Sequence, residues 1–234
     1  PEFFGTSVAI LVGDLALVYA EDMFQDSGLS AAALRRARSP WRGMRTEVIG
    51  GQLLDISLEA AGSESVELAN SVNRYKTAAY TIERPLHLGA AIAGASEDLI
   101  AAFRGYGHDI GIAYQLRDDQ LGVFGDPEIT GKPAGDDLRE GKRTELLALA
   151  LQRADESDPQ AAATLRKFIG QTSDPQELDR MAQIIADSGA PQEIERRIES
   201  LTQSGLEHLR AAQVDPAVTE TLERLAIKAT ARHK

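Results

Sequence analysis

The sequence contains no cysteine and few aromatic residues, and each scarcity limits what the protein can be. None of the 234 residues is Cys, and Phe, Trp and Tyr together make up 5%. Disulfide bonds, thiolate chemistry and cysteine-based zinc sites are therefore excluded. Alanine, leucine, arginine and glutamate are frequent instead, which favours helices packed through small and aliphatic side chains.

Histidine is also scarce, and the net charge is negative. The histidines are His87, His108, His208 and His233, and no two of them are four residues apart, so we expect no helical histidine metal site. The 36 acidic residues outnumber the 25 basic ones and give a formal charge of −11. Because nucleic-acid binding is driven largely by phosphate neutralisation, no nucleic-acid partner is expected.

No long uninterrupted apolar run is present. The longest, residues 7–20, includes Gly13 and Asp14 and is shorter than the roughly 20 residues that cross a bilayer. No signal peptide is visible. We therefore expect no transmembrane segment and a cytoplasmic protein, with a membrane-peripheral position as the alternative. Residues 5–25 are expected to form a strongly buried helix.

Helical periodicity recurs along the chain, and no sustained strand pattern appears, so we predict an all-α fold as a single domain over residues 1–234. A new helix is expected to begin near Pro40 and to run to about residue 61. Gly50 and Gly51 lie in the middle of it, and each costs about 1 kcal/mol relative to alanine in a helix. Close helix packing or a kink must offset that cost.

Most of the residues that suggest chemistry lie in the stretch 111–144, GIAYQLRDDQLGVFGDPEITGKPAGDDLREGKRT. An apolar helix carries Asp118 and Asp119 and ends in a loop rich in glycine and proline. Paired carboxylates on a buried face suit a hard cation such as Mg²⁺, which bridges to phosphate oxygens. With Lys132 and Lys142 nearby they could hold a magnesium diphosphate. The alternative is that these acids and lysines are solvated surface groups.

This stretch resembles the second aspartate-rich region of the trans-polyprenyl diphosphate synthases. That family has a DDxxD helix, a GDxxxTGK loop and a DLxxGK turn. The corresponding segments here are DDQLG at 118–122, GDPEITGK at 125–132 and DLREGK at 137–142. One departure is Gly122, which stands where the family often has its third aspartate.

Segments further upstream carry the same resemblance. YKTAAYT at 75–81 is similar to the family's KTAxYT segment, and Gln52 and Asp55 are similar to the glutamine and aspartate of its GQxxDL segment. The amino-acid sequence of these segments looks most like that of actinobacterial-type geranylgeranyl or longer-chain synthases. The resemblance implies a helix bundle of the isoprenoid synthase type, with about ten helices around a central cavity.

The resemblance also implies an activity. A chain-elongating prenyltransferase of this family condenses isopentenyl diphosphate with an allylic diphosphate to a longer polyprenyl diphosphate such as geranylgeranyl diphosphate. It implies Mg²⁺ as the cofactor and a homodimer as the assembly. Asp118 and Asp119 would hold Mg²⁺, and Asp118, Lys76 and Lys132 would be the catalytic residues. The substrates would be bound by Lys76, Thr77, Gln115, Lys132, Lys142 and Gln52.

The family's first aspartate-rich motif should lie upstream of Gly5, and nothing in residues 1–234 supplies it. The chain begins at Pro1 in the lead-in of a helix, so we expect a piece of a longer protein that lacks its N-terminal helices and is poorly active by itself. One alternative is a non-catalytic partner subunit of a prenyl synthase. Another is a terpene cyclase on a similar fold, which would need no isopentenyl diphosphate.

Overall fold

The described part of the chain is helical throughout. A computed structural model describes residues 2–131, 133–212 and 214–231, and contains no strand in those ranges. The all-α prediction is thereby confirmed. In chain order the elements are α1 (Glu2–Gln25), α2 (Ala31–Ala61), α3 (Val66–Val72), the π-helix η1 (Asn73–Glu83), α4 (Arg84–Ala93), α5 (Glu97–Phe124), α6 (Pro127–Thr130), α7 (Asp136–Glu140), α8 (Glu145–Ser157), α9 (Pro159–Phe168), α10 (Pro175–Asp187), α11 (Ala190–Ala211) and α12 (Pro216–Thr230).

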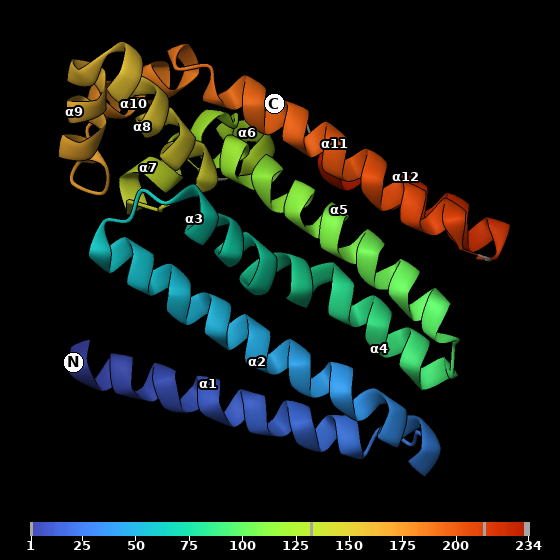
Figure 1. The fold of residues 1–234 in the computed structure, drawn as a ribbon. Helices are drawn as coiled ribbons and strands as arrows, with labels where there is room; N and C mark the ends of the chain where they lie inside the picture. The colour runs from blue at the N-terminus through green and yellow to red at the C-terminus, as the bar shows by residue number, and fades with distance from the viewer. Residues whose placement is uncertain (1, 132, 213, 232–234) are drawn as a thin grey trace.

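The long helices lie side by side, and the short helices gather at one end of them. Figure 1 shows α1, α2, the η1–α4 segment, α5 and α11 in succession, with α7 to α10 beside the C-terminal end of α5. The larger hydrophobic core lies between α5, these short helices and α11, where Leu116, Leu146, Met181 and Ile194 are fully buried. This packing holds the end of α5 that carries the paired aspartates.

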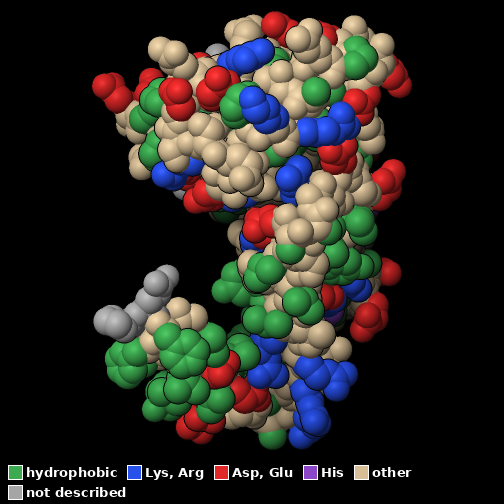
Figure 2. All heavy atoms as spheres, turned by 90° about the vertical axis from the view of Figure 1, so that its left-hand side faces the viewer, with side chains coloured by type: hydrophobic (Ala, Val, Ile, Leu, Met, Phe, Trp, Pro, Cys, Tyr) green, Lys and Arg blue, Asp and Glu red, His purple; other side chains and the backbone are tan. Residues whose placement is uncertain are grey.

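Helix α1 forms as expected, but the prediction that it is strongly buried is wrong. Phe3 and Met23 are 87% and 75% exposed. Side-chain contacts with α2 lie near the C-terminal end of α1, where Phe24 stacks on Trp41 at 4.7 Å between ring centroids. The Trp41 indole also donates to Glu21 at 2.7 Å. Figure 2, which looks at the N-terminal end of α1, shows hydrophobic side chains gathered there beside a hollow in the molecule.

Residues 31–61 form one continuous helix, so the prediction of a new helix start near Pro40 is also wrong. Pro40 lies inside α2 and is buried, although proline in a helix interior costs about 3 kcal/mol. The packing of α2 against α4 outweighs the tendency of Pro40 to interrupt a helix. One turn earlier, Arg36 donates to the carbonyls of Ala91 and Ile92 in α4 at 2.8 and 2.7 Å, which fastens α2 to α4.

Glycines allow two neighbouring helices to pack directly on the backbone of η1. A Cβ atom at Gly51 of α2 would come within 2.4 Å of the Lys76 amide nitrogen, whereas Gly50 has open space around it. On the other side, a Cβ at Gly111 of α5 would meet the Cα of Ala78 at 2.5 Å. Close packing thus offsets the free-energy cost of a glycine inside helix α2 at position 51. It also brings α2 and α5 close to the residues of η1.

Candidate active site

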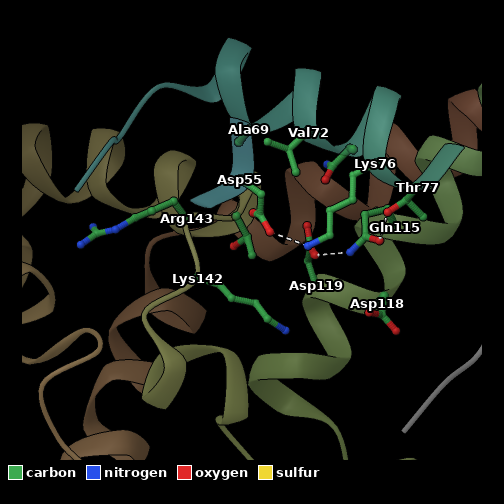
Figure 3. A pocket seen from close by; sticks show the side chains of 12 residues that line it. Asp55, Ala69, Val72, Lys76, Thr77, Gln115, Asp118, Asp119, Lys142 and Arg143 are labelled. Carbon is green, nitrogen blue, oxygen red and sulfur yellow. Dashed lines mark hydrogen bonds and ion pairs between the residues drawn. The ribbon is translucent and has the colours of Figure 1, made fainter. Parts of the chain in front are cut away.

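A cavity of about 190 Å³ lies where α2, α3, η1, α5 and the segment after α7 meet. Figure 3 shows Asp55, Lys76, Gln115 and Asp119 directed toward one another in this cavity, whereas the Arg143 side chain extends away from them. Asp118, half-buried, lines the same wall as Asp119, with its carboxylate directed away from Lys76. The full lining consists of Asp55, Ala69, Val72, Asn73, Lys76, Thr77, Gln115, Asp118, Asp119, Lys142, Arg143 and Thr144.

An ion pair between Lys76 and Asp55 crosses the cavity wall from η1 to α2. The Lys76 side chain is 36% exposed and that of Asp55 19%, so the ammonium group can be reached from the cavity. Asp55 holds this ammonium in place while no anion is near. A phosphate oxygen entering the cavity would compete for the same donor, because ammonium is a compact point charge that binds phosphate well.

A chain of hydrogen bonds orients Asp119. The Thr77 hydroxyl donates to Oε1 of Gln115 at 2.7 Å, and Nε2 of Gln115 donates to Oδ1 of Asp119 at 2.7 Å. Because the Gln115 oxygen already accepts from Thr77, its amide nitrogen must face the carboxylate. Two residues, Thr77 of η1 and Gln115 of α5, therefore set the direction of the Asp119 carboxylate.

Asp119 is suited to meet a cation. Its side chain is buried, and this burial raises the pKa of the carboxyl well above its usual range; the charges of Asp137 and Asp118 raise it further. Its second oxygen, Oδ2, is buried and has no hydrogen-bond partner among the described residues. A buried, unpaired carboxylate oxygen is costly, and a cation would remove that cost.

The donor set of this site fits Mg²⁺. Asp118 and Asp119 present carboxylate oxygens from the end of α5, which is the ligand chemistry that Mg²⁺ prefers. No group of three or more His, Cys, Asp or Glu side chains arranged for a metal occurs in the part of the chain that the structure describes. Two carboxylates suffice for this ion, since Mg²⁺ usually keeps several waters and shares phosphate oxygens.

Lys142 enters the cavity from the turn after α7. It forms an ion pair with the buried Asp137 and lies 3.6 Å from Glu140. Burial opposes the charge of Lys142, but the hydrogen bond and negative charge of Asp137 outweigh it and raise the pKa of the ammonium. Lys142 is therefore a permanent cation at the cavity, opposite the paired aspartates.

Comparison with known proteins places the chain in a family. The family model described as polyprenyl synthetase matches residues 2–187. The chain belongs to the polyprenyl synthetase family. A crystal structure of geranylgeranyl pyrophosphate synthase from Corynebacterium glutamicum, complexed with isoprenyl diphosphate and magnesium, is 64% identical with a TM-score of 0.97. The match covers 100% of this chain and 65% of that protein.

Curated relatives are more distant. The geranylgeranyl diphosphate synthase of Mycobacterium tuberculosis is 35% identical, over 68% of this chain and 45% of the relative. The geranylfarnesyl diphosphate synthase of Aeropyrum pernix is 38% identical, over 64% of this chain and 48% of the relative. The chain thus spans about half the length of the curated relatives that it matches.

The family match also bears on α1. The segment Phe3–Gln25 is long and apolar enough to cross a membrane, and none of the residues in its most apolar stretch is fully buried. The apolar helix is longer than the run 7–20 considered in the sequence, so length alone does not exclude a transmembrane segment. A core helix meets the same length and composition test, and α1 lies inside the region shared with the polyprenyl synthetases.

One residue expected at the site, Gln52, is not brought to the cavity, and another, Lys132, is not described. Gln52 is exposed on α2 and does not line the cavity. Gly51 faces η1, and Asp55 lies four residues later on nearly the same side, whereas Gln52 is turned by about 100° from Gly51. Lys132 lies outside the described residues, so its expected contact with the diphosphate stays a prediction.

The structure adds lining residues to which sequence reasoning gave no role. Arg143 follows Lys142 directly, and Asn73 begins η1 with its Nδ2 buried and without a hydrogen-bond partner among the described residues. An unpaired buried donor at a cavity is suited to an anionic or carbonyl oxygen of a ligand. Asp137 does not line the cavity but is the ion-pair partner of Lys142, which does, and its position in DLREGK was a signal that could have indicated it.

Proposed function

We propose that this polyprenyl synthetase chain carries the diphosphate-binding part of a Mg²⁺-dependent, chain-elongating prenyltransferase. The substrates would be isopentenyl diphosphate and an allylic diphosphate, and the product a longer polyprenyl diphosphate such as geranylgeranyl diphosphate. The observation that carries the proposal is the meeting of Lys76 and Lys142 with the Asp118–Asp119 pair in one cavity. The names of the relatives and the ligands of the C. glutamicum structure support it.

In this reaction the bond between the allylic carbon and the diphosphate oxygen breaks, and its electron pair leaves with the diphosphate. The double bond of isopentenyl diphosphate then attacks the allylic cation, and a proton is lost from the adduct. Magnesium, when bound, neutralises the charge that develops on the leaving diphosphate. Asp118 and Asp119 would hold that ion, with Asp119 kept in orientation by Gln115 and Thr77.

The cationic side chains have a separate task. Lys76 would exchange its contact with Asp55 for a diphosphate oxygen, and Lys142 would approach the same group while tied to Asp137. Fixed positive groups in a partly buried cavity stabilise developing negative charge without reorganisation at the moment of reaction. The expected contribution of Lys132 belongs to the same step.

We also propose the assembly and location of the protein. Large apolar side chains remain exposed on α1 and α2, among them Leu11 at 66%, Val18 at 55% and Leu53 at 67%. A homodimer would cover such a surface. We place the protein in the cytoplasm. A long apolar product would bring it into contact with a membrane surface. Light scattering of the purified chain tests the dimer, and a monomer at micromolar concentration would contradict it.

A binding experiment tests the first part of the proposed function. Calorimetric titration of the chain with a non-ionising analogue of an allylic diphosphate should give binding that requires Mg²⁺ and weakens at least tenfold in Lys76→Ala. Lys228→Ala removes an exposed lysine of α12 and is the matched control, with unchanged affinity. Binding that is independent of Mg²⁺ and of Lys76 would refute the proposal.

A condensation assay tests the rest. The chain fused to the part of the C. glutamicum enzyme that it does not cover should convert isopentenyl and allylic diphosphates to a longer polyprenyl diphosphate. A product formed from the allylic substrate alone would indicate a cyclase instead. Ligand binding without any turnover in the fusion, together with stable association with an active homologue, would indicate a non-catalytic partner subunit.

A further inference from the structure

A second cavity, of about 390 Å³, lies between the C-terminal end of α1 and the first half of α2, and it shares no lining residue with the active-site cavity. Four of its lining residues are arginines and one is acidic, in a chain whose net charge is −11. A positive cavity in so acidic a protein attracts anions. The lining consists of Glu21, Phe24, Gln25, Leu34, Arg35, Arg38, Trp41, Arg42 and Arg45.

The arginines of this cavity lie on one face of α2, because they follow one another at intervals of three and four residues. Arg36 is turned by about 100° from Arg35. Its guanidinium group donates to the carbonyls of α4 described above and serves the packing of the two helices. The helix thus separates an arginine used for packing from those that face the cavity.

One arginine of the cavity is neutralised by the acid beside it. Arg45 pairs with Glu21 at 2.5 Å, and its guanidinium carbon lies 5.2 Å from the centre of the Trp41 ring. Glu21 also accepts hydrogen bonds from Gln25 and from Trp41, both at 2.7 Å. These two bonds lower the pKa of Glu21, so its carboxylate is charged at neutral pH and is already engaged.

The other three arginines keep their charge available. Arg35, Arg38 and Arg42 are exposed and form no hydrogen bond or ion pair with the described residues. Arg45 also retains a buried donor, Nε, that has no hydrogen-bond partner in the described part of the chain. A buried donor without a partner carries a desolvation cost that the oxygen of an anion would remove.

The spacing of the free arginines indicates an anion larger than one phosphate. Arg35 and Arg42 are seven residues apart, which is about 10 Å along a helix, so different guanidinium groups can meet different phosphate groups of one molecule. Guanidinium binds phosphate oxygens in a bidentate manner. Trp41, stacked on Phe24, forms an apolar wall, and such a wall strengthens the attraction by lowering the local dielectric constant.

We propose that this cavity is a second anion site, which binds the diphosphate group of a small molecule through Arg35, Arg38 and Arg42 without magnesium. The inference does not rest on the proposed function, because the cavity uses guanidinium groups in place of a metal and has none of the active-site residues. Trp41 is the sole tryptophan of the chain, so its fluorescence reports on this cavity.

Titration of the chain with inorganic pyrophosphate in the presence of EDTA tests the proposal, followed by tryptophan fluorescence and by calorimetry. EDTA removes Mg²⁺, which binding in the active-site cavity is expected to require. Pyrophosphate should produce a saturable change in emission and a saturable heat. Orthophosphate should bind at least tenfold more weakly, since a single phosphate group meets fewer guanidinium groups.

A double variant and a matched control assign the binding to the arginines. Arg38→Gln combined with Arg42→Gln should weaken pyrophosphate binding at least tenfold without lowering the melting temperature, because both side chains are exposed. Arg224→Gln combined with Lys228→Gln removes two exposed cations with the same four-residue spacing from α12. This control should bind pyrophosphate as the parent does.

Several results would overturn the inference. They are a parent chain with neither a saturable heat nor a change in emission, equal affinity for orthophosphate, and equal losses in the two double variants, which would show that binding follows net charge alone.

Lys76→Ala separates this inference from the proposed function, and it should leave the titration in EDTA unchanged. A loss of binding in Lys76→Ala would place the pyrophosphate in the active-site cavity and overturn the second site. If pyrophosphate binds in EDTA as expected but the chain shows no binding that requires Mg²⁺ and Lys76, the proposed function fails and the second site stands.

Discussion

The backbone of Lys76 lies directly against Gly51, so close that a Cβ atom at position 51 would come within 2.4 Å of the Lys76 amide nitrogen. Gly51→Ala should therefore push α2 away from η1, loosen the Lys76–Asp55 pair and lower the free energy of unfolding by about 2 kcal/mol. Urea denaturation measures this. The adjacent Gly50→Ala has open space and should stabilise the protein by about 0.5 to 1 kcal/mol. Equal effects at the two positions would contradict the packing.

Asp118 is expected to be essential for turnover. In the fusion protein described above, Asp118→Ala should lower the condensation rate by roughly two to three orders of magnitude, the scale of losing one preorganised electrostatic element. Steady-state kinetics with saturating substrates measures the rate. Asp98→Ala, at an exposed acid of α5 far from the cavity, is the control. An Asp118→Ala rate within a few-fold of the parent would refute the role of the paired aspartates.

Glu83 is a buried acid with two arginine partners. Its side chain is 2% exposed and pairs with Arg74 at 2.5 Å and with Arg104 at 3.0 Å. Glu83→Gln keeps the shape but leaves the guanidinium groups without a counter-charge, so we expect a loss of about 2 kcal/mol in the free energy of unfolding. Glu220→Gln, at an exposed acid of α12, should stay within about 0.5 kcal/mol of the parent. A neutral Glu83→Gln would show that this network does not stabilise the fold.

Tyr106 should make the protein sensitive to alkaline pH. Its hydroxyl donates to the Leu222 carbonyl at 2.8 Å, and burial raises the pKa of the phenol to about 12, against about 10 in an unfolded chain. Between these values the folded state binds more protons than the unfolded state, so stability is present below pH 10 and is lost as pH rises towards 12.

Denaturant unfolding between pH 9 and 12, comparing the parent with Tyr106→Phe, measures this dependence. The variant should lose about 1 kcal/mol at neutral pH, where its hydrogen bond is missing, and should show a flatter decline above pH 10. A decline as steep as that of the parent would assign the alkaline transition to other groups.

Much of the fold could be predicted from local pattern. Helical periodicity predicted the all-α class, and glycine and proline located the break after Phe124, although the predicted loop also contains the short helix α6. These signals succeed because helix hydrogen bonds, caps and turn conformations are made between residues close together in the chain. Pro40 is the counterexample: its local signal indicated a helix start, and packing of α2 on α4 kept the helix continuous.

The residue types of the site were also readable from the sequence. The acids at 118 and 119, the lysines at 76 and 142 and their companions Thr77 and Gln115 stand in a specific order and spacing that resembles one family, and the described structure brings them to one cavity. Gln52 was not brought there, because the face that α2 turns to η1 is set by Gly51 and its contact with Lys76.

What the sequence by itself determined was the helical class of the protein and the chemical groups available to the site, since both are encoded by short-range order and composition. Tertiary structure decided which of those groups meet. Only contacts between distant segments could reveal that Asp55 holds Lys76, that α1 is exposed, and that Gly51 lies against the backbone of Lys76. The physical reason is steric: two atoms cannot share one volume, and the chain positions that compete for it are far apart along the sequence.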